Sequence, residues 1–201
     1  MGKPLHPSQS EVGSFHPPNR DRRIHIALAA FGLAAFALHT YFKVQEGLLP
    51  ELLWGCNVSA AALILSFAFE WYAVVGAAFL WRLVLGEPGF LLGVGSGERY
   101  GWTTAFVHLV PTLLALFYLR RSGLPKGSAL WATLGSLLLV LAAHAFSPAR
   151  LNVNFAHDRV PLLAAWFPGR WSYRLVSALL IIGSLSAAES LLRRGWPAPR
   201  R

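Results

Sequence analysis

Cysteine and charged residues, acidic ones above all, are scarce in this sequence. Cys56 is the only cysteine among 201 residues, so the chain cannot form an internal disulfide. Charged residues make up 13% of the chain, whereas soluble domains carry about a quarter. Because 55% of the residues are also hydrophobic, the composition excludes an ordinary soluble domain and predicts a single membrane domain.

The N-terminal segment lacks the features of a cleaved or lipidated leader. Residues 1–23 are polar and have no apolar core before Arg20, so we do not expect them to be a cleavable signal peptide. His6 stands where a myristoylation signal needs Ser or Thr. We therefore expect residues 1–23 to form a basic tail.

Long apolar runs follow this tail, and several reach the roughly 20 residues that a bilayer-spanning helix needs. They predict an all-α, polytopic transmembrane helical bundle over residues 24–192 and a second basic tail over 193–201. Between the spans, the Gly-rich segment 86–101 is expected to be a loop. The six expected spans cover residues 24–43, 50–69, 71–85, 102–119, 128–146 and 172–192.

The net charge of +9 fits basic membrane-flanking segments better than a nucleic-acid partner. Six spans place both termini on one side, together with the turn at Arg120, Arg121 and Lys126. That side holds 11 of the 18 Lys and Arg residues, so the positive-inside rule predicts that both termini are cytoplasmic. A bacterial-type inner membrane is the expected location, and membrane lipids are the expected partners.

Polar side chains within the expected spans cluster near the non-cytoplasmic boundary. At 1.5 Å of rise per residue, those on the spans lie within roughly 5–10 Å of it. Unpaired polar groups are costly in hydrocarbon and therefore tend to face a bundle interior or a site. The pattern predicts an outward-facing polar cavity. On the spans the residues are His39, Cys56, Asn57, His108 and His144, and the following loop adds Asn152, Asn154, His157 and Asp158.

A thiol and an imidazole at one depth favour nucleophilic chemistry on an ester. Cys56 would attack a lipid acyl carbonyl, and His108 would take the thiol proton. The backbone N–H of Asn57 would hold the oxyanion. Pro111, one turn after His108, would open space by kinking its helix. The residues expected to line the substrate site are Asn57, His39, His144, Asn152 and Asn154.

Other functions remain open from the residues alone. Imidazoles on facing helices can ligate haem or a metal, with His39, His108 and His144 as ligands. No pair of them has a tight spacing and no carboxylate falls in the cluster, so neither a metal site nor a cofactor is predicted. A transporter would need inverted repeats or buried carboxylates, which the sequence does not reveal. A membrane subunit without chemistry of its own is the remaining alternative.

Three short segments carry a resemblance to a known family. They are Trp54-Gly55-Cys56-Asn57, His108-Leu109-Val110-Pro111 and Leu151-Asn152-Val153-Asn154-Phe155. In order and spacing they resemble the YwaF-type integral membrane proteins over about residues 24–192. That family is similar to eukaryotic transmembrane phospholipid acyltransferases and, more distantly, to androgen-induced intramembrane hydrolases. The resemblance implies Cys56 as nucleophile, His108 as base, and Asn152 or Asn154 as site-lining residues.

Overall fold

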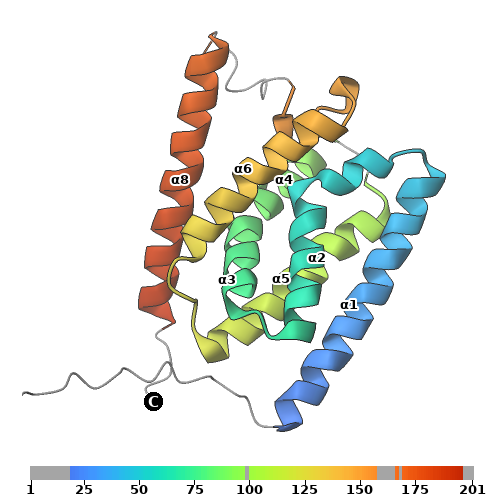
Figure 1. Cartoon of the computed structure of the whole chain (residues 1–201), viewed down its shortest axis with the longest axis vertical. Coiled ribbons are helices and arrows are strands. Elements are labelled where there is room, and N and C mark those ends of the chain that lie inside the picture. The colour runs from blue at the N-terminus through green and yellow to red at the C-terminus, as the bar shows by residue number, and fades with distance from the viewer. Residues whose placement is uncertain (1–18, 98–99, 158–165, 168, 197–201) are drawn as a thin grey trace, which may run out of the picture.

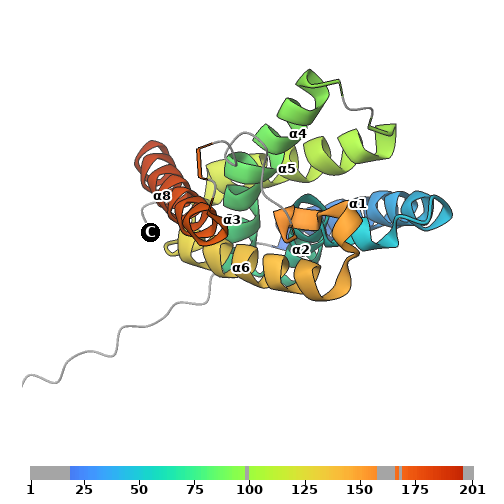
Figure 2. The ribbon, with the colours of Figure 1, turned by 90° about the horizontal axis from the view of Figure 1, so that it is seen from above.

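The chain folds into one helical bundle. The computed structural model describes residues 19–97, 100–157, 166–167 and 169–196, and no strand occurs among them. The prediction of an all-α fold is therefore confirmed. The long helices α1 (Asn19–Gln45) and α8 (Arg170–Gly195) lie on opposite sides of the bundle, as Figures 1 and 2 show.

The shorter helices between α1 and α8 build the centre of the bundle. Two 3-10 turns, η3 (Ala149–Leu151) and η4 (Val153–Phe155), follow them. In chain order the central elements are η1 (Leu49–Leu53), α2 (Gly55–Phe69), α3 (Tyr72–Trp81), η2 (Arg82–Gly86), α4 (Glu87–Gly95), α5 (Trp102–Ser122) and α6 (Ser128–Phe146).

Local sequence explains where several of these helices begin and end. Pro50 lies in the first turn of η1, where its missing N–H costs no hydrogen bond. Gly123, directly after α5, and Gly127, directly before α6, have φ values of +78° and +83°. Such a backbone suits glycine because it has no Cβ. The two glycines therefore allow α5 to turn back into α6 within a few residues.

The third predicted span is longer than the sequence suggested. Its expected end at residue 85 is wrong, and so is the expected loop over residues 86–95, because the apolar helix runs from Tyr72 to Gly95. The helix continues through η2, a π-helical turn in which the N–H of Glu87 donates to the carbonyl of Arg82. Pro88 follows directly and has no N–H to donate to the preceding turn. The wider π turn accommodates this missing hydrogen bond, so the helix continues.

The expected tails also begin and end elsewhere. Helix α1 starts at Asn19, so it includes the end of the segment that was expected to be a tail, and α8 continues to Gly195. Residues 1–18 and 197–201 lie outside the described part of the chain.

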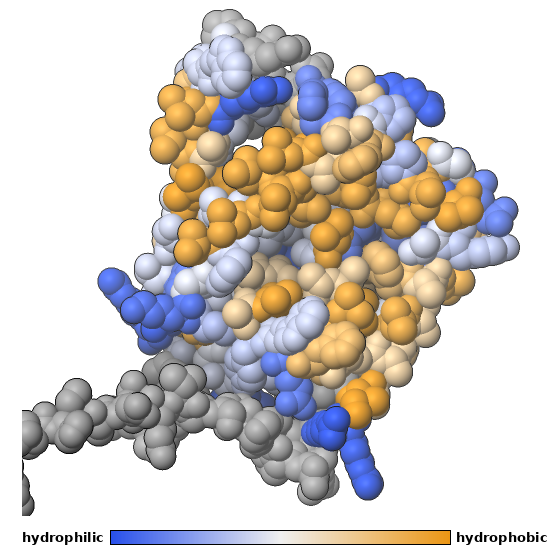
Figure 3. Space-filling view, in the orientation of Figure 1, coloured by the Kyte–Doolittle hydropathy of each residue, from blue (hydrophilic) through white to orange (hydrophobic). Residues whose placement is uncertain are grey.

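The helices have the length and surface of a membrane protein. Within the described ranges, five helices are long and apolar enough to cross a bilayer, and α2 is a shorter apolar helix. Hydrophobic residues form a broad band across the bundle with hydrophilic residues at both ends (Figure 3). A soluble monomer rarely exposes so much contiguous apolar surface. The large side chains exposed on several helices include Phe31, Leu113, Phe117, Leu137, Leu138, Leu179 and Leu180.

The core lies where α2, α3, α5 and α6 meet, and its fully buried members include Leu63, Phe79 and Leu119. Helices α3 and α6 approach closely at Gly76, because a Cβ there would lie 2.4 Å from Oγ of Ser128. Small residues of this kind allow close helix packing in membranes. The start of α1, the α5–α6 turn and the end of α8 share one end of the bundle (Figure 1).

Candidate functional site

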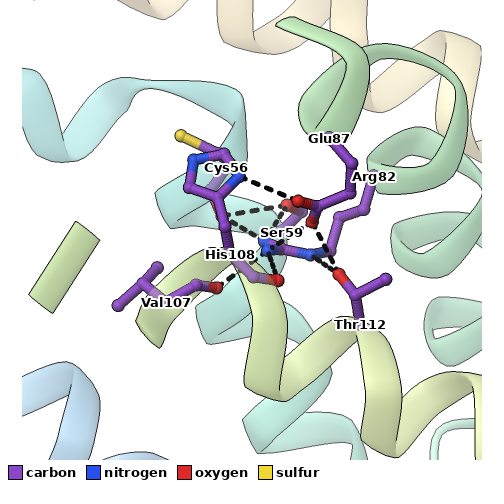
Figure 4. A network of polar contacts seen from close by, with 7 residues as sticks. All are labelled: Cys56, Ser59, Arg82, Glu87, Val107, His108 and Thr112. Carbon is purple, nitrogen blue, oxygen red and sulfur yellow. Dashed lines mark hydrogen bonds and ion pairs between the residues drawn. The ribbon is translucent and has the colours of Figure 1, made fainter. Parts of the chain in front are cut away.

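A buried arginine connects three helices in the middle of the bundle. Arg82 is 0% exposed, and its guanidinium group donates to α2, α4 and α5 (Figure 4). Arginine carries five N–H donors and no acceptor, so a buried guanidinium needs several acceptors; six acceptors from the described residues surround Arg82, and three of them share Nη2. The distances are 2.7 Å from Nε to Oγ1 of Thr112, 2.7 Å from Nη1 to the carbonyl of Cys56, 3.2 Å from Nη1 to Oγ of Ser59, 2.9 Å from Nη2 to Oε1 of Glu87, and 2.8 Å and 2.6 Å from Nη2 to the carbonyls of Val107 and His108.

One of these acceptors is a carbonyl that a proline leaves without a helical partner. Pro111 lies inside α5 and has no N–H, so it cannot donate to the carbonyl four residues earlier. That carbonyl belongs to Val107, and Arg82 donates to it instead. The guanidinium therefore satisfies the backbone group that the proline frees, in a region where an unsatisfied carbonyl costs several kcal/mol.

Glu87 is the counter-ion of Arg82, and the π turn explains how the two meet. Residues five apart in an α-helix point about 140° away from each other. In the π turn the backbone hydrogen bond spans five residues, so Arg82 and Glu87 lie one above the other. The Glu87 carboxylate accepts from Arg82 and, at 2.7 Å, from the hydroxyl of Thr112.

The same carboxylate holds the histidine of α5. Nδ1 of His108 lies 3.2 Å from Oε2 of Glu87, and the His108 residue is buried with 4% exposure. Phe90, on α4, stacks on this ring with 4.3 Å between centroids and 17° between planes. A carboxylate at one edge and an aromatic face on one side together fix the orientation of the imidazole.

Cys56 joins this centre through its backbone. It lies in the first turn of α2, its carbonyl accepts from Arg82, and its side chain is half-buried with a free thiol. In the view of Figure 4 the Cys56 side chain and the His108 ring lie at the same edge of the network. Within the described part of the chain the thiol makes no hydrogen bond to His108, which leaves Nε2 of the ring available.

The remaining predicted residues near Cys56 hold the backbone in place. Nδ2 of Asn57 donates to the carbonyl of Glu51 at 2.9 Å. Oδ1 of Asn154 accepts from the N–H of Gly55 at 2.8 Å, and its Nδ2 donates to the carbonyl of Leu53 at 2.7 Å. Asn154 therefore caps the start of α2 from about a hundred residues away in the sequence.

The oxyanion donor expected from the sequence is already occupied. The backbone N–H of Asn57 donates to the carbonyl of Trp54 at 2.9 Å, so that prediction is wrong. The neighbouring N–H of Cys56 donates to no backbone carbonyl among the residues that the structure describes. It belongs to the first turn of α2, where helices leave N–H groups without internal partners.

His39 lies deep between α1 and α5. Its ring is 1% exposed, and Nδ1 lies 3.1 Å from Oγ1 of Thr103. Its Nε2 is buried and has no hydrogen-bond partner within the described residues. Thr103 also lines an apolar groove of about 240 Å³ between α1 and α5, with Phe31, Ala34, Ala35, Leu38, Trp102 and Phe106.

The structure does not join His144 and Asn152 to this centre. His144 is exposed, and its ring lies 4.9 Å from that of His157. Oδ1 of Asn152 accepts from the N–H of His157, whose Nε2 lies 3.0 Å from the carbonyl of Ser147. These residues stabilise the turn after α6. Asp158, expected beside them, lies outside the described residues.

Sequence reasoning missed the acidic member of the centre. Arg82 falls within the expected third span and Glu87 within the expected loop over 86–101, and neither was predicted to have a role. The available signal was a pair of opposite charges five residues apart, followed by Pro88, within one apolar stretch.

No described group of three or more His, Cys, Asp and Glu side chains has the arrangement of a metal site. Comparisons with protein-family models, with curated proteins and with solved structures found no match.

Proposed function

We propose that this membrane protein catalyses acyl transfer from, or hydrolysis of, a lipid ester, with Cys56 as nucleophile and His108 as general base. The observation that carries the proposal is the pairing of His108 with Glu87 at the guanidinium group that also binds the carbonyls of Cys56 and His108. An activated nucleophile typically has a base within reach, and that base is oriented by a third group. Here the carboxylate at Nδ1 is the third group, and the base keeps Nε2 for the thiol.

The location of the centre supports a lipid substrate. It lies in the half of the bundle that holds the start of α2, away from the end where the basic α5–α6 turn lies (Figure 1). With the basic end cytoplasmic, by the positive-inside rule, the centre is near the outer leaflet, at the depth of lipid ester groups. Intramembrane ionisable residues mark a functional site by default.

The reaction proceeds in two halves. His108 Nε2 takes the proton from the Cys56 thiol, and the thiolate attacks the ester carbonyl of the lipid. The N–H of Cys56, in the first turn of α2, is a donor for the resulting oxyanion. The C–O bond then breaks, His108 returns the proton to the leaving alkoxide, and a thioester remains on Cys56.

In the second half, water or the hydroxyl of an acceptor lipid attacks the thioester carbonyl while His108 accepts its proton. The C–S bond breaks, and the proton passes back to the Cys56 sulfur. Hydrogen bonds between such groups are often long without substrate and tighten when it binds. The free thiol of Cys56 is therefore compatible with the role of a nucleophile.

The test is lipid turnover by the purified protein in phosphatidylcholine vesicles that carry an isotope-labelled acyl chain and a lysophospholipid acceptor. Mass spectrometry measures free fatty acid, acylated acceptor and acyl adduct on the protein. The wild-type protein should form product and an adduct of acyl mass on Cys56. Cys56→Ala and His108→Gln should each lower turnover by about 10²-fold or more.

His144→Gln is the matched control, because His144 is an exposed histidine away from the centre. Its turnover should equal that of the wild type. Turnover that persists in Cys56→Ala, or a wild-type protein that forms neither product nor adduct, would reject the proposal and favour a membrane subunit without chemistry of its own.

A further inference from the structure

The two oxygens of the Glu87 carboxylate have different partners. Oε1 accepts from Nη2 of Arg82 at 2.9 Å and from the hydroxyl of Thr112 at 2.7 Å. Oε2 faces Nδ1 of His108 at 3.2 Å. The carboxylate is thus held on one side by two donors and offers its other oxygen to the imidazole.

Counting protons in this group determines which ring nitrogen of His108 carries hydrogen. Arg82 is always protonated, and its full burial requires a counter-charge nearby. Glu87 supplies that charge as an ionised carboxylate, which can only accept hydrogen bonds. Nδ1 of His108 must therefore carry the proton in their contact. In a neutral imidazole, Nε2 then has a lone pair.

We infer that Glu87 is a positioning residue that fixes the tautomer of His108, so that Nε2 is the nitrogen able to take the Cys56 proton. The inference rests on the proposed function for its catalytic meaning, whereas the tautomer itself can be measured without a substrate. Phe90 assists by stacking on the ring, which opposes a ring flip that would exchange the two nitrogens.

A purely structural role for Glu87 makes a different prediction. If Glu87 served only as the counter-ion of Arg82, any group that preserved the fold would leave the His108 proton where it was. Glu87→Gln separates the two roles. Arg82 and Thr112 both donate toward Oε1, so the carboxamide oxygen of glutamine should stay there and its NH₂ group should face His108.

That orientation reverses the hydrogen bond at the ring. The NH₂ group can only donate, so Nδ1 of His108 must accept and the ring proton must move to Nε2. The glutamine variant should therefore retain the shape of the site and lose the base. The observable consequence is an exchange of the protonated nitrogen, which loss of a counter-ion alone would not cause.

The experiment is nitrogen NMR of the full-length protein labelled with ¹⁵N-histidine, in micelles at neutral pH. His108→Gln assigns the signals. The wild-type protein should show His108 with Nδ1 protonated and Nε2 unprotonated, and Glu87→Gln should show the reverse. Thr112→Val removes one donor to Oε1 but keeps the carboxylate, so its His108 should keep the wild-type tautomer.

The wild-type spectrum decides the matter even if Glu87→Gln fails to fold because of the uncompensated charge on Arg82. An Nε2-protonated or doubly protonated His108 in the wild type would overturn the inference. So would a folded Glu87→Gln variant whose His108 tautomer is unchanged.

Turnover in the vesicle assay then links the tautomer to chemistry. Glu87→Gln should lower acyl transfer by about 10²-fold, whereas Glu46→Gln should leave it unchanged. Glu46 is a suitable control because its side chain is 55% exposed and contacts only Lys43 among the described ion pairs, at 3.8 Å.

If the wild type shows the expected tautomer but no turnover, the proposed function fails and the positioning by Glu87 stands. If turnover is present and Glu87→Gln does not lower it, the inference fails and the Cys56–His108 pair stands.

Discussion

Replacing Arg82 with methionine tests whether this side chain holds the three central helices together. The substitution removes every donor of the guanidinium group and keeps a flexible apolar chain of similar length. It leaves the Glu87 carboxylate without its cation in a largely buried place. Breaking a buried ion pair from one side costs about 3–5 kcal/mol.

The backbone adds to this cost. The carbonyl of Val107 loses the donor that replaces the missing N–H of Pro111, and an unsatisfied buried acceptor costs about 1–3 kcal/mol. Because these terms share one side chain they are not additive, and we expect a total loss of about 4 kcal/mol. For a chain of this size each kcal/mol shifts Tm by about 2–4 °C, so Tm should fall by roughly 8–16 °C.

The assay is thermal unfolding of the purified protein in micelles, followed by circular dichroism. Expression level is a poor substitute, because removing an arginine from a span eases membrane insertion by about 2.5–3.5 kcal/mol and so acts in the opposite direction. Arg120→Met is the matched control, since Arg120 is exposed at the end of α5, and its Tm should change by less than about 2 °C.

A double variant shows whether the unpaired charge causes the loss. Arg82→Met combined with Glu87→Gln removes both charges, so it should be more stable than Arg82→Met alone by about 1 kcal/mol or more. The reasoning would be refuted by an Arg82→Met protein whose Tm matches that of the wild type. A double variant less stable than the sum of the two single changes would refute it equally.

Two further substitutions test the packing and capping at the start of α2. Gly55→Ala should lower the free energy of unfolding by about 1–3 kcal/mol, because its Cβ would lie 2.1 Å from Cζ2 of Trp81. Gly89→Ala is the control, since nothing lies within 4 Å of its Cβ and helix propensity favours alanine by up to about 1 kcal/mol. Asn154→Ala should cost about 1–3 kcal/mol, because the N–H of Gly55 and the carbonyl of Leu53 lose their partners. Thermal unfolding measures all three, and equal Tm values for the two glycine variants, or no loss in Asn154→Ala, would contradict the contacts at this end of α2.

The sequence allowed the membrane class and most helix positions to be predicted, because long apolar runs leave few alternatives. It failed at the third span for a specific reason. Glycines at positions 86, 89, 93 and 95 together with Pro88 usually indicate a loop. In an apolar segment, however, the backbone must satisfy its own hydrogen bonds, and a π turn followed by more helix achieves that.

The polar centre was predictable only in part, because depth in the membrane does not specify a partner. Cys56 and His108 were expected on different helices at a similar depth, and the carbonyls of both residues accept from the same guanidinium group. Asn154 was expected to line the site, yet both ends of its carboxamide bind backbone. Glu87 was not predicted as a partner of Arg82, because in a regular α-helix with 3.6 residues per turn the two side chains would point away from each other.

Two prolines on two helices account for the composition of this centre. Pro111 frees a carbonyl on α5, which requires a donor from outside the helix. Pro88 follows the π turn, which directs Glu87 toward Arg82. Arg82 thus donates to the carbonyl that Pro111 leaves free in α5. It also pairs with Glu87, which the π turn brings within reach.

This arrangement also sets the spacing between the proposed nucleophile and base. Nη1 binds the carbonyl of Cys56, and Nη2 binds the carbonyl of His108. The guanidinium group is planar and rigid, so the distance between these two carbonyls is fixed by one side chain rather than by the packing of two apolar helices. A catalytic pair must be held to within a fraction of an ångström to be effective, and a charged, fully hydrogen-bonded anchor is suited to that task.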